Sequence, residues 1–149
     1  MNATLPFPDC DLREHPPRAA RAMLGGLYFL PRTIDKMRAK IQGTLGAYKI
    51  GPGISMYLFE WLGFTEVEFE ELVRTGASDD EIVAWVHAHS DPAKYDEIND
   101  QLVNRGIRDE EHRATMLPNY PILAERPELR NWFEIFDLDD AWLFDPARK

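Results

Sequence analysis

The sequence contains a single cysteine, Cys10, among 149 residues. One thiol excludes an intramolecular disulfide and any zinc site built from several cysteines. Long apolar runs are also missing, since none approaches the roughly 20 residues that a membrane-spanning helix needs. The first 17 residues, MNATLPFPDCDLREHPP, lack the basic flank and apolar segment of a signal peptide. We therefore expect a cytoplasmic protein that neither crosses nor binds a membrane.

Basic residues are scarce in the later part of the chain. Residues 1–59 hold 8 Lys or Arg against 4 Asp or Glu, whereas residues 60–149 hold 9 against 22, and the net charge is -9. This distribution is expected to repel nucleic acid and to steer small anions toward the first part. An acidic surface that keeps the protein soluble explains most of the excess negative charge.

Recognised catalytic and cofactor motifs are absent. The sequence has no phosphate-binding Walker loop, dinucleotide-binding glycine pattern, HExxH or CxxC. Asp137, Asp139 and Asp140 resemble only the start of a calcium loop, without its glycine and closing glutamate. We interpret these three acids as helix-end caps and surface charge. The motifs predict no metal site, and they name neither a cofactor nor a reaction, so they do not decide whether the protein is an enzyme.

Helical periodicity dominates what is present. Apolar residues recur at helical spacing after residue 53, and two capping boxes, Thr65 with Glu68 and Ser78 with Glu81, mark helix starts. We predict an all-α fold, a compact single-domain bundle of about five to seven short helices over residues 1–149, with a short strand or hairpin near residues 44–50. Residues 1–16 are predicted to be an extended segment that packs on the bundle or frays from it.

Residues 30–53 combine an amphipathic helix with a glycine-rich turn. Pro31 suits a first helical turn and Gly43 suits the position just past a helix end. The apolar face and the basic face of this helix are Leu30, Ile34, Met37 and Ile41 on one side, and Arg32, Lys36 and Lys40 on the other. After the helix, Gly43 and Gly46 allow sharp turns that expose backbone N–H groups.

This stretch predicts a binding site for a phosphate or carboxylate group. Arg38 would hold the anion, Asp35 would orient Arg38, and Lys36 or Lys40 would add positive charge. Close backbone approach at the glycines and the Tyr48 hydroxyl would complete the site. The predicted ligand-binding residues are Arg32, Asp35, Lys36, Arg38, Gly43, Gly46 and Tyr48. An enzyme would also need a proton-transfer group, for which the candidates are Tyr48, His15 and Asp35.

A simpler interpretation assigns the same residues to structure. In it, Arg32, Lys36 and Lys40 form a solvated face, Asp35 and Arg38 form an ion pair along the helix, and the glycines only turn the chain.

Several segments together resemble a known family. These are HPPR at residues 15–18, LGGLYFLPRTIDKMRAK at 24–40, GTLGAY at 43–48, SDDEIVAWV at 78–86 and DLDDA at 137–141. They resemble the bacterial domain-of-unknown-function family 5069. The resemblance implies a small, stand-alone, bacterial cytoplasmic domain without an established activity. Members of the family often have CPLD after the glycine turn, where this chain has GPGI at 51–54 and therefore lacks that Asp.

Two functional hypotheses follow. The first is a protein that binds a small anionic metabolite at residues 32–48. The second is a non-catalytic protein-interaction or regulatory module that forms a homodimer or contacts a partner, suggested by the uneven charge and the four tryptophans.

Overall fold

The computed structural model describes residues 5–51 and 53–148 of the chain. Within these residues there are eight α-helices, one two-stranded antiparallel sheet and three short 3-10 turns. The helices are α1 Leu30–Gln42, α2 Ile54–Leu62, α3 Glu66–Arg74, α4 Asp79–Ala88, α5 Tyr95–Val103, α6 Glu110–Met116, α7 Ile122–Glu125 and α8 Trp132–Leu143. The strands are β1 Met23–Leu24 and β2 Leu27–Tyr28. The predicted all-α class is confirmed, because each strand of the only sheet in the described residues is two residues long.

The small hairpin lies at residues 23–28 and not near residues 44–50, where the prediction placed it. Met23 pairs with Tyr28 and Leu24 pairs with Leu27. Gly25 and Gly26 between them have φ angles of 62° and 87°, the positive values that a two-residue hairpin turn requires. Residues 44–50 instead form turns without a strand.

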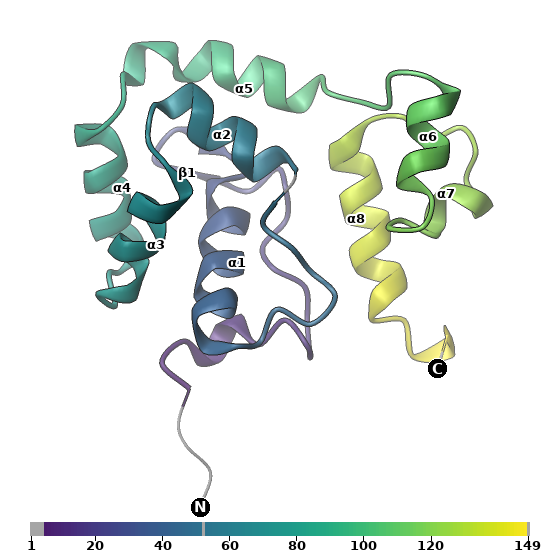
Figure 1. Ribbon diagram of the computed structural model, residues 1–149, viewed down its shortest axis with the longest axis horizontal. Coiled ribbons are helices and arrows are strands. Elements are labelled where there is room, and N and C mark those ends of the chain that lie inside the picture. Colours follow the sequence, from purple (N-terminus) through teal and green to yellow (C-terminus); the bar gives the residue numbers. More distant parts are fainter. Residues whose placement is uncertain (1–4, 52, 149) are drawn as a thin grey trace, which may run out of the picture.

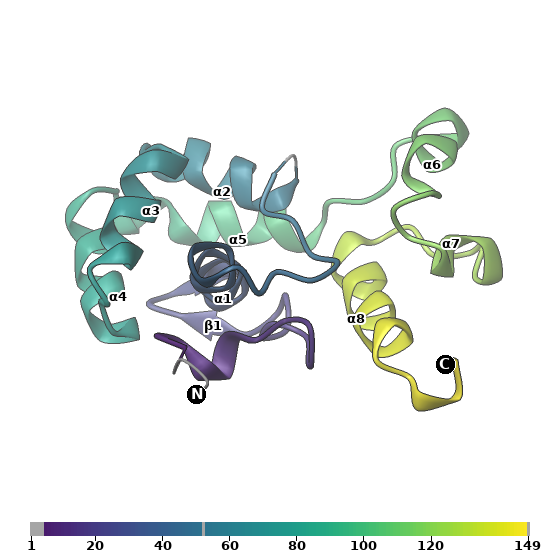
Figure 2. The same cartoon turned by 60° about the horizontal axis from the view of Figure 1, so that its bottom comes forward.

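Helix α1 lies at the centre of the molecule. Figures 1 and 2 show α1 surrounded by α2 and the α3–α4 pair, by the hairpin, and by α8 on the remaining side. Leu30, Ile34 and Met37 are completely buried, as the amphipathic pattern predicted. Because α8 covers the other side of α1, the predicted solvated face is wrong for two of its members. Arg32 is 2% exposed and Lys36 is 8% exposed.

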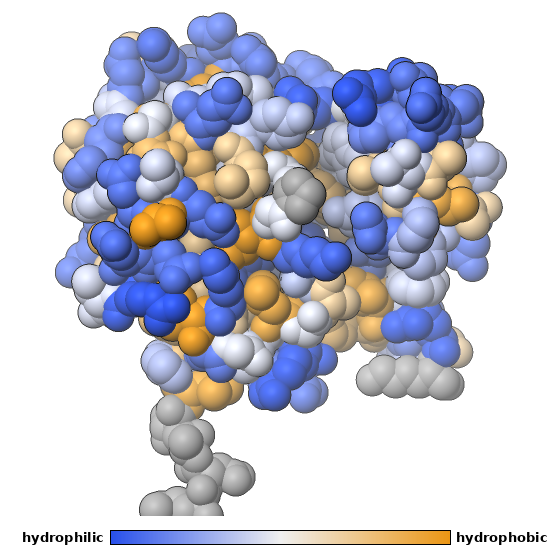
Figure 3. Space-filling view, in the orientation of Figure 1, coloured by the Kyte–Doolittle hydropathy of each residue, from blue (hydrophilic) through white to orange (hydrophobic). Residues whose placement is uncertain are grey.

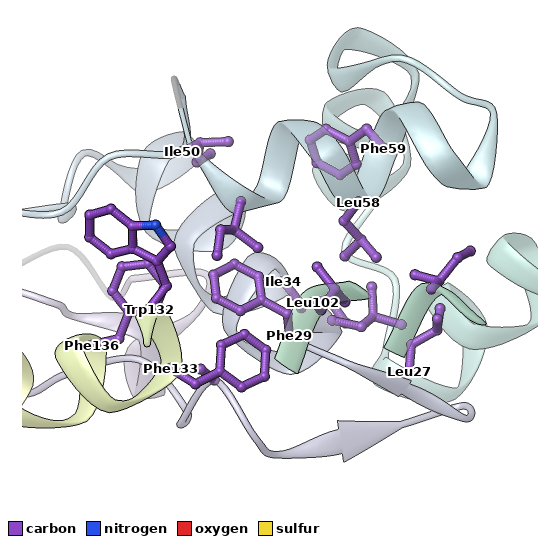
Figure 4. Close-up of a cluster of buried hydrophobic side chains, with 14 of the residues drawn as sticks. Leu27, Phe29, Ile34, Ile50, Leu58, Phe59, Leu102, Trp132, Phe133 and Phe136 are labelled. Carbon is purple, nitrogen blue, oxygen red and sulfur yellow. The ribbon is translucent and has the colours of Figure 1, made fainter. Parts of the chain in front are cut away.

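Aromatic side chains join α1 to α8. The ring of Phe29, the residue before α1, lies 5.8 Å from the rings of both Phe133 and Phe136. Figure 4 shows these rings together with Trp132 at the start of α8. Aromatic pairs at such distances contribute about 0.5–1.5 kcal/mol each beyond the area they bury. This cluster therefore fixes α8 beside α1 although the two are about a hundred residues apart.

Local signals set several helix ends as predicted. Both capping boxes are formed, with Thr65 and Ser78 accepting hydrogen bonds from the backbone N–H groups of Glu68 and Glu81. Gly43 ends α1 with a φ of 77°, a left-handed conformation that favours glycine.

The segment before the hairpin packs along α1 from residue 7 onward. The amide of Gln42 donates hydrogen bonds to the carbonyls of Phe7 and Cys10, and its oxygen accepts one from the Phe7 N–H. The Leu12 N–H donates to the Thr44 carbonyl at 2.9 Å. Residues 1–4, which belong to the predicted extended segment, lie outside the described residues. No helix in the described part of the chain is both long and apolar enough to cross a membrane.

Candidate functional site

A cavity of about 210 Å³ lies between α1 and α8. Its walls come from the start and middle of α1, residues 47–50, the start of α2, the turn between α6 and α7, and the second half of α8. Tyr120 and Phe29 add aromatic walls, and the polar residues of the lining are Arg32, Lys36, Tyr48, Lys49, Asn119 and Asp139. Figure 1 shows how the connection from α1 to α2 passes over this side of the molecule.

A buried ion pair borders the cavity through its Arg32 side chain. Arg32 donates two hydrogen bonds to the Asp140 carboxylate, from Nη1 at 2.7 Å and from Nη2 at 2.9 Å. The Tyr48 hydroxyl donates a third hydrogen bond to this carboxylate at 2.7 Å. Burial and the adjacent Asp140 charge raise the pKa of Tyr48, so its hydroxyl stays protonated. The pair is therefore electrically neutral and fixed in geometry.

Lys36 faces the cavity one turn along α1 from Arg32. Burial, reinforced by the nearby Arg32 charge, lowers the pKa of Lys36 from 10.5 to about 7. Its Nζ lies 5.7 Å from the centroid of the Phe29 ring. No acceptor in residues 5–51 or 53–148 receives a hydrogen bond or ion pair from it. Near neutral pH the amine is thus divided between its charged and neutral forms.

Asp139 supplies a second group that titrates near neutrality. Its side chain is contributed by α8, and the residue is only 6% exposed. Burial and the negative charge of Asp140 raise the pKa of Asp139 from 3.8 to about 6. An amine and a carboxyl with pKa values of about 7 and 6 in one cavity can exchange protons with a ligand at physiological pH.

The cavity wall also contains an unusual backbone conformation. Phe29 has a φ of 69° and is the only non-glycine residue with positive φ in the described part of the chain. A left-handed conformation costs an L-residue about 1–2 kcal/mol. The stacking of Phe29 on α8 offsets this cost and holds the ring against the cavity. Such strained residues are concentrated at binding and catalytic sites.

The structure divides the predicted ligand-binding residues between two sides of α1. Arg32, Lys36 and Tyr48 meet at the cavity. Asp35 and Arg38 lie elsewhere, in a network with Arg18 and Asp79 described next.

Asp35 and Arg38 each pair with residues distant in sequence, so the expected ion pair between them is wrong. Asp35 accepts hydrogen bonds from the backbone and guanidinium of Arg18. Arg38 lies 3.1 Å from Asp79 and donates to the Ala77 carbonyl. These contacts tie α1 to the start of α4 and occupy both side chains, which the anion hypothesis assigned to a ligand.

The two predicted glycines serve the turn after α1. Gly46 has a φ of 60°, and a Cβ there would lie 2.9 Å from the Leu12 carbonyl oxygen. A Cβ added at Gly43 would meet no atom within 4 Å. Of the remaining candidates, Lys40 pairs with Glu70 on the surface, and exposed His15 contacts the Pro16 carbonyl. None of these four residues lines the cavity.

Sequence reasoning missed the acidic half of the site. Asp139 and Asp140 were expected to be caps and surface charge, and this is wrong because both are buried. A usable signal was present in the periodicity. Asp140 follows Phe133 by seven residues and Phe136 by four, so it continues the apolar stripe of α8. An acid on a buried stripe needs a partner, which Arg32 provides.

Other reactive side chains are unsuited to chemistry at this site. Burial, followed by the charge of Asp35, raises the pKa of the Cys10 thiol to about 12, so the thiolate is scarce. The described residues contain no group of three or more His, Cys, Asp or Glu side chains that could hold a metal ion.

The fold and the cavity define a mostly α-helical protein with a small polar site between its first and last α-helices. Residues 14–142 match the family described as Domain of unknown function (DUF5069). Because the match covers most of the chain, the protein belongs to this family, and the resemblance seen in the sequence is confirmed. A comparison with curated proteins finds no match. The family's description states no activity, so a function has to be argued from the cavity.

Proposed function

We propose that this protein binds a small anionic metabolite in the cavity between α1 and α8, with its anionic group against Lys36. The observation that carries the proposal is the position of the Lys36 amine, which is buried at the cavity wall and makes no hydrogen bond or ion pair with the described residues, although the Asp139 and Asp140 charges act on it from a distance. Burying an ammonium group is costly unless it is paired. A bound carboxylate or phosphate would supply the missing charge.

The composition of the cavity suits a compact polar ligand. Its volume of about 210 Å³ is below the roughly 300–1,000 Å³ of typical drug-sized sites. Phe29 and Tyr120 offer apolar contact, while Asp139 can accept a hydrogen bond from a hydroxyl or amine of the ligand. Arg32 would orient the ligand through its position in the cavity wall rather than attract it by charge, because Asp140 already neutralises Arg32. The ligand we propose therefore carries one anionic group and at least one hydrogen-bond donor.

The proposal predicts a specific pH dependence of binding. An anion held by Lys36 prefers the protonated amine, so binding above pH 7 takes up a proton. With a Lys36 pKa of about 7, the affinity should fall roughly 25-fold from pH 6.5 to pH 8.5. Ionisation of Asp139 also weakens the binding of an anion as the pH rises. Because the pKa of Asp139 is about 6, most of this loss of affinity occurs below pH 7.

The experiment is a thermal-shift screen with carboxylate and phosphorylated metabolites, followed by calorimetry of each hit at pH 6.5, 7.5 and 8.5. Lys36→Met should abolish both the binding and the proton uptake. Asp139→Asn should leave the change above pH 7 in place. Lys40→Met is the matched control, since Lys40 lies on the same helix but pairs with Glu70 at the surface. Hits whose affinity is the same in Lys36→Met and Lys40→Met would refute the proposed site.

The surface gives less support to the interaction-module hypothesis. The large exposed hydrophobic residues come from four separate regions and are Met23, Met56, Tyr57, Val67 and Leu117. On the face shown in Figure 3, hydrophobic residues are interspersed with hydrophilic ones. Scattered apolar residues are normal on a protein surface. The cavity is therefore the stronger basis for a function.

A further inference from the structure

A second cavity, of about 240 Å³, adjoins the first. The two share a wall made of Gly53, Ile54, Met116, Tyr120 and Phe136. Beyond this wall the second cavity is bordered by the connection between α5 and α6, the start of α8, and Tyr57 of α2. Tyr120 and Phe136, the aromatic residues of this wall, thus line both cavities.

Arg105 is held in place on one side of the second cavity. Its guanidinium carbon lies 3.9 Å from the centroid of the Tyr57 ring and 5.5 Å from that of Trp61. Stacking covers the face of a guanidinium and leaves the N–H groups at its edge available. The backbone is fixed as well, because the Arg105 carbonyl accepts a hydrogen bond from the Trp132 N–H at 3.0 Å.

Arg108 and His112 supply further donors. The backbone N–H of Arg108 and its side-chain Nε approach His112 Nδ1 at 3.1 Å and 3.5 Å. Because Nδ1 accepts from the backbone, the neutral ring carries its proton on Nε2. The His112 ring packs edge-on against Trp132, with 5.9 Å between the centroids. Two guanidinium groups and one imidazole N–H therefore belong to this small region.

The second cavity has no acidic residue in its described lining. This is notable in a chain with 26 Asp and Glu residues. Arg130, close by, pairs with Glu110 at 2.9 Å, whereas no ion pair among the described residues includes Arg105 or Arg108. The first cavity, by contrast, contains Asp139. Arg105 and Arg108 thus have no ion-pair partner among the described residues.

We infer that the second cavity binds a phosphate group through Arg105, Arg108 and His112, and that the ligand is a phosphorylated metabolite that extends past Tyr120 toward Lys36. The second half of this statement rests on the proposed function, whereas the phosphate site does not. Phosphate is favoured over a carboxylate because its oxygens can accept from two forked guanidinium groups and an imidazole together.

The first experiment measures the affinity of inorganic phosphate by calorimetry at constant ionic strength. Arg105→Gln and Arg108→Gln should each weaken binding about tenfold, as expected for the loss of a charge-assisted hydrogen bond. Arg130→Gln is the matched control and should change the affinity less than twofold. Arg108 is exposed, so its variant reports on binding even if Arg105→Gln unfolds. Absence of phosphate binding, or equal weakening in all three variants, would overturn the inference.

A parallel titration with acetate separates the two anion classes. Weaker binding of acetate than of phosphate is expected. If acetate binds more tightly and responds to the same variants, the cavity is a carboxylate site and the phosphate assignment is wrong.

The second experiment tests whether one ligand joins the two cavities. Phosphorylated hydroxy acids of two to four carbons are titrated into the parent protein and into Lys36→Met. For at least one of them, Lys36→Met should weaken binding about tenfold more than it weakens the binding of phosphate itself.

The outcomes distinguish this inference from the proposed function. If Arg108→Gln weakens phosphate binding but Lys36→Met affects no ligand, the proposed function fails and the joined ligand is overturned. If Lys36→Met weakens carboxylate binding while Arg108→Gln changes nothing, the proposed function survives and the phosphate site is refuted.

Discussion

Replacing Lys36 by methionine should stabilise the protein at neutral pH. The change keeps a long, flexible side chain and removes the buried amine. Burial lowers the pKa of this amine from 10.5 to about 7, and each unit of pKa corresponds to about 1.4 kcal/mol. The penalty that Lys36 imposes on folding is therefore on the order of 5 kcal/mol at and below pH 7, and Lys36→Met removes it.

The sign of the pH dependence provides the sharper test. Between pH 7 and 10.5 the unfolded chain holds the Lys36 proton and the folded chain does not. The contribution of Lys36 to the free energy of unfolding of the parent should therefore rise with pH in this window. Methionine cannot titrate, so the stability advantage of the variant should shrink by about 1.4 kcal/mol per pH unit. Urea denaturation at pH 7.5, 8.5 and 9.5 measures this difference directly.

Lys40→Met is the control for the same experiment. The Lys40 ammonium lies 2.6 Å from Glu70 at the surface, and this hydrogen bond raises the pKa of Lys40. Lys40 therefore stays protonated in both states up to pH 9.5, and its variant should show no slope relative to the parent. If Lys36→Met also shows no slope, Lys36 is solvated, and the argument for an unpaired amine in the cavity fails.

Three further predictions concern the surroundings of the cavity. Asp139→Asn should stabilise the protein by roughly 3 kcal/mol at pH 7 but not at pH 4. The raised pKa of about 6 makes the folded parent bind more protons than the unfolded chain between pH 4 and pH 6, so the parent loses stability as the pH rises through this range. Urea titrations at pH 4 and pH 7 test this. Asp140→Asn should cost about 3–5 kcal/mol by leaving the Arg32 charge buried and unpaired, and a loss below 1 kcal/mol in urea would contradict that role. Gly43→Ala should lower the free energy of unfolding by about 1–2 kcal/mol through its positive φ alone. Gly46→Ala should lower it further, because the added Cβ would lie 2.9 Å from a carbonyl oxygen. Equal shifts in Tm for the two variants would show that this close approach is unimportant.

Helical spacing accounts for which of the predicted site residues lie together in the structure. Arg32 and Lys36 share one side of α1 because they are four residues apart, and the structure places both at the cavity with Tyr48. Asp35 and Arg38 were assigned to the same site because they are close in sequence. Their positions on the helix direct them to Arg18 and Asp79, which the sequence order gave no reason to expect.

The second cavity shows a different limit of sequence reasoning. Arg105 and Arg108 occur in a connection without any motif, in the acidic part of the chain. They line the second cavity because backbone pairing of Gly106 with Asn131 brings that connection next to the start of α8. The net charge summed over residues 60–149 is strongly negative and therefore conceals this small basic region.

The sequence by itself determined the family, the mostly α-helical class and several helix ends, because these depend on interactions within a few residues. The capping boxes at Thr65 and Ser78 and the glycine after α1 are examples. Only the tertiary structure decided which basic residues of α1 are buried, since α8 must first pack on α1 through Phe29 and Phe133. That packing removes Lys36 from water and sets its pKa, a change that depends on a helix about a hundred residues away.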